Sequence, residues 1–122
     1  DRATEVFSPE VFMPAPAQGA LAVECRSDDA VAREAIDKLI DDAATAESTA
    51  ERAVLARLEA GCTAPVAASA VLEGTNVTLR AGVFALDGSR QLVEEAQGTD
   101  PAELGRKVAE ALLERGAADV ME

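Results

Sequence analysis

The chain has 122 residues, 48% of them hydrophobic, and a formal net charge of −12. This is enough for one compact domain, whose core must be aliphatic because the only aromatic residues are three Phe. The acidic balance excludes a typical nucleic-acid or anionic-membrane binder, which needs a basic surface. With no signal peptide or apolar run of membrane-spanning length, we expect a cytoplasmic protein that binds neither nucleic acid nor membrane.

The first 40 residues predict pieces of structure rather than a domain. Three of the five prolines fall in SPEVFMPAPAQG (8–19), which favours an extended connector. ALAVEC (20–25) has the length and polarity of a short buried strand. The segment 27–42 predicts a helix with Ser27 or Asp28 as N-cap and an apolar stripe of Val31, Ala35, Ile36, Leu39 and Ile40.

A second helix is predicted near 48–59. Ser48-Thr49-Ala50-Glu51 matches a capping box, and Gly61 is placed to end the helix. Its apolar stripe consists of Ala50, Val54, Leu55 and Leu58.

Three strands and a last helix follow. Residues 64–73 and 90–96 favour strands, and NVTLRAGVFAL (76–86) alternates apolar and other residues with strand periodicity. Asp87-Gly88 predicts a hairpin turn. Asp100-Pro101-Ala102-Glu103 predicts the start of a helix that Gly116 ends. The fold class is therefore α+β: a three-stranded antiparallel sheet covered on one face by helices, preceded by a strand-helix remnant of another domain.

Cys25 and Cys62 are the two cysteines, too few for a disulfide framework and without zinc-site spacing. Cys62 lies in EAGCTAPVA (59–67), at a junction between a predicted helix and a strand. The chain has no histidine, which excludes a Cys–His hydrolase, and a helix C-terminus disfavours a thiolate. On residue types alone, both cysteines fit buried structural positions.

Three stretches, in the same order along the chain, resemble the porphobilinogen deaminase (hydroxymethylbilane synthase) family. TAERAVLARLEAGCTAPVAASA (49–70) is similar to the family's thiol-carrying segment, PAPAQGALAVECR (14–26) to its Gly-Gln-Gly-Ala segment, and GVFALDGSRQLVEE (82–95) to a hairpin of its third domain. The resemblance implies a transferase that joins four porphobilinogen units into hydroxymethylbilane and releases ammonia. It also implies that Cys62 holds a dipyrromethane cofactor through a thioether, which requires no histidine.

Two alanines depart from the family pattern. Ala60 and Ala17 stand where the family usually has the first glycine of Gly-Gly-Cys and of Gly-Gln-Gly. If the backbone at Ala60 needs a positive φ, alanine there costs on the order of 1 kcal/mol. Gln18 and Gly19 either line the cleft of the intact enzyme or only form a proline-flanked turn.

The resemblance covers the C-terminal portion of the family's protein. It implies that residues 1–19 are the end of domain two and a crossover connector, 20–41 complete domain one, and 42–122 form the cofactor-tethering domain. The catalytic groups would lie in absent domains, so we expect no catalytic residue here, no metal site and no activity of this chain alone. The alternative is a non-enzymatic α+β module for ligand binding or dimerisation. Residues 20–25, without a partner strand, predict self-association.

Overall fold

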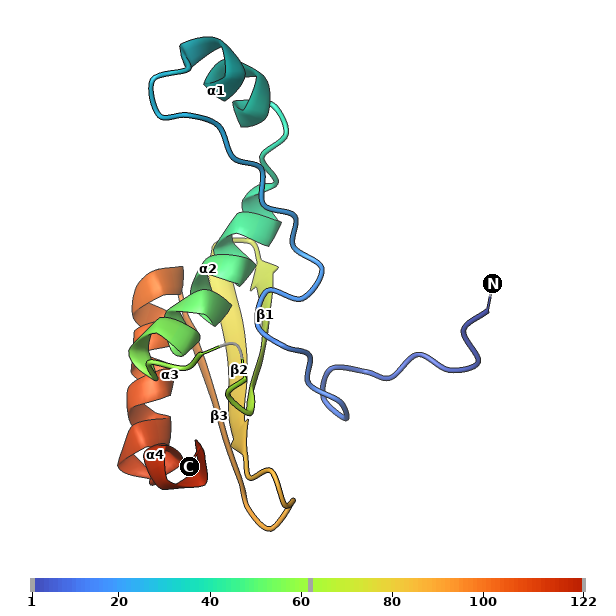
Figure 1. Ribbon diagram of the computed structural model, residues 1–122, viewed down its shortest axis with the longest axis vertical. Coiled ribbons are helices and arrows are strands. Elements are labelled where there is room, and N and C mark those ends of the chain that lie inside the picture. Colours follow the sequence, from blue (N-terminus) through green and yellow to red (C-terminus); the bar gives the residue numbers. More distant parts are fainter. Residues whose placement is uncertain (1, 62, 122) are drawn as a thin grey trace.

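The computed structural model describes residues 2–61 and 63–121 (Figure 1). The described residues form one three-stranded sheet and four helices. In chain order the elements are α1 (Ala30–Asp37), α2 (Asp42–Arg57), β1 (Val66–Glu73), β2 (Asn76–Phe84), β3 (Gln91–Gly98), α3 (Pro101–Glu114) and α4 (Ala117–Met121).

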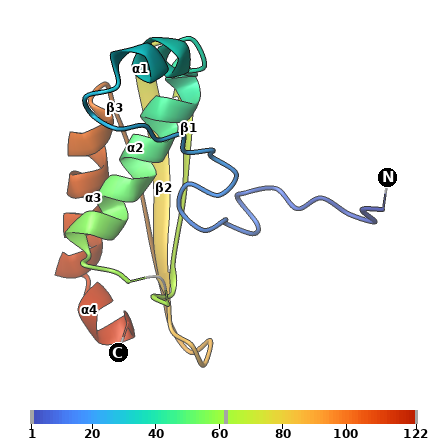
Figure 2. The ribbon, with the colours of Figure 1, turned by 45° about the horizontal axis from the view of Figure 1, so that its top comes forward.

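The sheet is an antiparallel meander with strand order β1-β2-β3. Val83 pairs with Val66 on one side and with Leu92 on the other, which sets the register of all three strands. Helices α2 and α3 cover the same face of the sheet in both ribbon views (Figures 1 and 2). The alternation of NVTLRAGVF places every second residue of β2 against these helices, and Val77, Leu79, Ala81 and Val83 are at most 1% exposed. The predicted α+β fold is confirmed.

Helices α2 and α3 pack closely because α3 carries a glycine at their contact. A Cβ atom built on Gly105 would overlap the carbonyl oxygen of Ala50 and the side chain of Ala53. Both Ala50 and Ala109 are fully buried in the resulting core. Gly105 thus sets how near the two helices can come.

Local signals predicted α3 correctly. The Asp100 side chain accepts a hydrogen bond from the Glu103 amide at 3.0 Å, and Pro101 occupies the first turn. Gly116 follows the C-cap with φ of +91°, a conformation that glycine adopts without a Cβ penalty.

The start of α2 was predicted wrongly. The helix begins at Asp42, with Asp41 as N-cap accepting from the Ala44 amide. Ser48 therefore lies inside the helix, where its hydroxyl donates to the Ala44 carbonyl at 2.6 Å, and no capping box forms. Glu51 instead bonds segments distant in sequence. The end was also misplaced, because α2 stops at Arg57, before Gly61.

The predicted strand at 20–25 does not form. These residues are exposed and have no strand assignment, since no other described segment offers them a ladder of hydrogen bonds. Cys25 is exposed, which corrects the expectation of a packed core thiol. Helix α1 forms within the predicted segment 27–42 but is shorter: its N-cap is Asp29, it ends at Asp37 before Leu39 and Ile40, and none of its residues is buried. It lies beyond the N-terminal end of α2, away from the sheet (Figure 1).

The connector contacts the sheet at several points. The Ala68 amide donates to the Pro14 carbonyl at 3.1 Å, and Arg80 Nη1 donates to the Glu10 carbonyl at 2.9 Å.

No helix in the described ranges is long and apolar enough to cross a membrane.

Candidate functional site

The segment that follows α2 and leads to position 62 begins with a hydrogen-bonded helix cap. Leu58 is the C-cap, the Glu59 amide donates to the Ala56 carbonyl, and the Ala60 amide donates to the Leu55 carbonyl at 3.0 Å. This pair of bonds is a Schellman motif, with Glu59 at the left-handed position where glycine is usual. Its φ is +53°. The motif fixes where the loop leaves the helix.

Ala60 does not have a positive φ, because the left-handed position of this helix end is Glu59. The concern that alanine strains position 60 is therefore unfounded. Ala17, for which no such cost was predicted, does adopt the left-handed conformation, with φ of +58°, which costs a residue other than glycine about 1 kcal/mol.

Replacing Glu59 with glycine is expected to raise the free energy of unfolding by about 1 kcal/mol, because glycine has no Cβ to clash in the left-handed region. Urea unfolding of this chain measures the change. Ala60→Gly is the matched control, since it adds backbone freedom at an ordinary φ and should not stabilise. Equal stabilisation by both variants would contradict the assignment of strain to Glu59.

Residues 58–61 and 63–65 border a cavity of about 390 Å³, which Leu86 and Met121 also line. Gly61 and Thr63 are both exposed, and a Cβ built on Gly61 would meet no atom within 4 Å. Beyond them, the Ala64 amide donates to the Gly61 carbonyl and Pro65 precedes β1. Cys62, the predicted cofactor-binding residue, lies outside the described residues. Its neighbours form an open loop held between α2 and β1.

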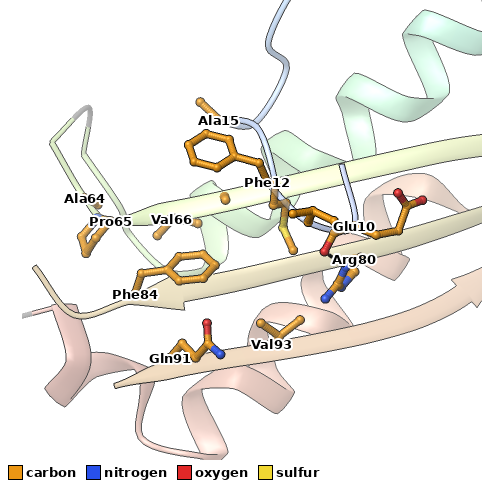
Figure 3. Close-up of a pocket in the computed structure, with 13 residues that line it drawn as sticks. Glu10, Phe12, Ala15, Ala64, Pro65, Val66, Arg80, Phe84, Gln91 and Val93 are labelled. Atoms are coloured by element: carbon orange, nitrogen blue, oxygen red, sulfur yellow. Dashed lines mark hydrogen bonds between the residues drawn. The ribbon is translucent and has the colours of Figure 1, made fainter. Parts of the chain in front are cut away.

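A second cavity of about 540 Å³ lies between the connector and the sheet face opposite the helices (Figure 3). Phe12 and Phe84 provide aromatic walls, Arg80 and Gln91 provide polar groups, and Ala64 and Pro65 bring the loop to its edge. Arg80 already donates to the Glu10 carbonyl, so one guanidinium donor is occupied. Sequence reasoning missed this cavity because the connector that closes it was not expected to contact the sheet.

Gln18 and Gly19 lie near the other end of α2. They line a cavity of about 220 Å³ with Ala44, Ser48 and Glu51. Because α2 rises about 1.5 Å per residue, the ten residues from Ser48 to Leu58 separate these groups from the Cys62 loop by about 15 Å. The structure therefore does not bring Gln18 and Gly19 beside that loop.

Glu51 was not predicted as a site residue. Among the residues that the structure describes it is the only charged one that is buried, with 9% of its surface exposed. One carboxylate oxygen accepts from the Ala70 amide at 2.7 Å and the other from the Ala17 amide at 2.5 Å. Burial raises the pKa of Glu51, the two amide donors lower it, and the nearby Glu47 raises it further. Ionisation of Glu51 therefore lowers the free energy of unfolding as the pH rises above the ordinary glutamate pKa. The two hydrogen bonds offset this cost only in part.

Two family models match most of this chain. Residues 45–114 match the family "Porphobilinogen deaminase, C-terminal domain", and residues 1–34 match "Porphobilinogen deaminase, dipyromethane cofactor binding domain". Within residues 2–61 and 63–121, no cluster of three or more Cys, Asp or Glu residues could hold a metal ion.

Curated relatives named porphobilinogen deaminase are similar over nearly all of this chain. The protein from Corynebacterium aurimucosum is 59% identical over 99% of this chain, and that from Corynebacterium glutamicum is 55% identical over 99%. The protein from Deinococcus radiodurans is 42% identical over 99%. The chain spans only 41%, 42% and 40% of these three proteins. The comparisons give no support to the alternative of a non-enzymatic module.

Proposed function

This chain belongs to the porphobilinogen deaminase family, and from that premise we propose that it is the C-terminal part of a tetrapyrrole-forming transferase. The full-length enzyme would join four porphobilinogen units into hydroxymethylbilane and release one ammonia per unit. The observation that supports this proposal most directly is the match of residues 45–114 to the family's C-terminal domain. By the same proposal, residues 1–19, 20–41 and 42–122 belong to three different domains, and the enzyme is cytoplasmic.

Cys62 is the residue that would hold the dipyrromethane cofactor through a thioether. The loop around it fits a bulky attached group, because Gly61 and Thr63 are exposed and the cavity beside them measures about 390 Å³. When bound, the cofactor would supply the pyrrole carbon to which the substrate units are added. The contribution of this chain is positional: the Schellman motif after Leu58 holds one end of the loop, and at the other end Pro65 directly precedes β1.

The chain provides few cations for a substrate that carries several carboxylates. The described residues that line the loop cavity include Glu59 but neither Lys nor Arg. The net charge of −12 would also repel a polyanion. Neutralising groups must therefore come from other parts of the full-length enzyme, along with proton transfer at the reacting pyrroles.

Peptide mapping of the full-length protein by mass spectrometry tests the proposal. The peptide that contains Cys62 should carry a two-pyrrole adduct, while the peptide that contains Cys25 should be unmodified and serves as the internal control. An unmodified Cys62 in active enzyme would contradict the assignment.

This chain alone is expected to be inactive. Incubated with porphobilinogen, it should form no hydroxymethylbilane above the uncatalysed background, because the groups that bind and protonate the pyrroles are proposed to lie elsewhere. A colorimetric assay of the oxidised porphyrin product measures this, with the full-length enzyme as the positive control. Turnover by the chain alone would show that this chain contains the active site.

We also propose that this chain associates with a second copy through residues 20–25. Leu21 and Val23 are 94% and 58% exposed, and the backbone there has no strand partner. Sedimentation should show a dimer or larger species, and Val23→Pro should dissociate it by removing an amide donor. A strict monomer at high concentration would refute the proposal.

A further inference from the structure

Glu51 joins two segments that are far apart in the sequence. Its Oε1 accepts from Ala70 of β1 and its Oε2 accepts from Ala17 of the connector. Among residues 2–61 and 63–121 no cation pairs with Glu51, and its two hydrogen bonds come from main-chain amides. A buried carboxylate that retains its charge usually does so because it is well satisfied by donors.

The outer edge of β1 shows how Glu51 differs from Glu47, the other carboxylate of α2 that bonds to this strand. Three successive outward amides of this edge strand are each satisfied: Ala68 donates to the Pro14 carbonyl, Ala70 to Glu51 and Leu72 to Glu47. These bonds protect the edge from pairing with another strand. Glu47, one helical turn before Glu51, binds β1 alone. Glu51 binds β1 and the connector together.

Helix α2 connects Glu51 to the loop that contains Cys62. Glu51 precedes the C-cap Leu58 by seven residues, about 10 Å along a rigid helix, and the Schellman motif then sets the direction of the loop. The connector (8–19) continues on one side to residues 2–7 and on the other to residues 20–41. Its position against α2 therefore determines where the loop lies relative to both.

We propose that Glu51 is a positioning residue for the transferase: by binding the connector and β1 at once, it fixes the Cys62 loop relative to the rest of the full-length enzyme. This inference rests on the proposed function. A loss of this link displaces the tethered chain from the reacting groups rather than removing any group that reacts. A displacement of about 1 Å can lower the rate of a positioned reaction by about a hundredfold.

The test is Glu51→Gln in the full-length enzyme. Glutamine has the same shape, but its NH2 group would face one of the two amide donors, so only one bond can remain. Stability should change little, because the substitution also removes a buried charge. We expect kcat to fall by about tenfold or more and KM to change less than about twofold. Hydrogen exchange in peptides covering 14–20 should become faster.

Glu47→Gln is the matched control, because the Glu47 carboxylate accepts a hydrogen bond from β1 but none from the connector. Its kcat should stay within about twofold of the wild type. Glu51→Asp, which keeps the charge but shortens the side chain by one methylene, is the second variant. It should also lose kcat, and it decides the question if the glutamine variant does not fold.

Two results would overturn the inference. One is a kcat within twofold of the wild type in Glu51 variants whose connector exchanges faster. The other is an equal loss of kcat in Glu47→Gln. Adduct mapping distinguishes failure of the positioning role from failure of the proposed function. Wild-type enzyme without an adduct on Cys62 would refute both the proposed function and the positioning role. A normal adduct with unchanged kcat in the Glu51 variants would refute only the positioning role.

Discussion

Full-length enzyme with Cys62→Ala is expected to carry no covalent dipyrromethane and to lose porphobilinogen turnover to background. Alanine offers no sulfur for the thioether, and the other cysteine of the chain, Cys25, lies on a different segment, before α1. The core should be unaffected, since the adjacent Gly61 and Thr63 are exposed. The free energy of unfolding should therefore change by less than about 0.5 kcal/mol. Intact mass, turnover and urea unfolding measure these three quantities.

Cys25→Ala is the matched control for the missing thiol. It should keep the adduct and the activity. In this chain Cys25 is exposed, so its replacement should leave stability unchanged. In the full-length protein, where other segments are proposed to cover residues 20–25, it should cost about 1 kcal/mol. An adduct that persists in Cys62→Ala, or that is lost in Cys25→Ala, would contradict the assignment.

The parts of the fold that were predictable depend on local chemistry. Asp100 and Pro101 start α3 through a side-chain bond three residues away, and the alternation from Val77 to Val83 requires only one covered face. The resemblance that identifies Cys62 is likewise carried by contiguous residues. Each of these signals depends only on residues that are close together in the sequence.

The parts that were missed depend on distant segments. Residues 20–25 have strand-like composition, but a strand needs a partner, and the described residues provide none. Glu51 looked like half of a capping box, but its carboxylate bonds amides 34 and 19 residues away. No pattern around Glu51 indicates those donors. The hydrogen bonds on which the proposed role of Glu51 rests therefore became visible only in the folded chain.

Gly105→Ala is expected to destabilise the domain by about 2 kcal/mol. In an isolated helix, alanine would be more favourable than glycine by about 1 kcal/mol. Here the new Cβ would overlap the Ala50 carbonyl and the Ala53 side chain, and both lie on the facing helix rather than at the end of a flexible side chain. Helices α2 and α3 must then move apart, and such overpacking costs about 1–3 kcal/mol or more.

Urea unfolding of this chain measures the Gly105→Ala effect as a lower midpoint with an unchanged slope. Gly61→Ala is the matched control, because its Cβ meets nothing within 4 Å, and it should change stability by less than about 0.5 kcal/mol. A Gly105→Ala domain as stable as the wild type would mean that α2 can shift without loss of packing. Because α2 also leads to the Cys62 loop, a shift of that kind would disturb the proposed tether, and adduct formation in full-length Gly105→Ala should then be slower.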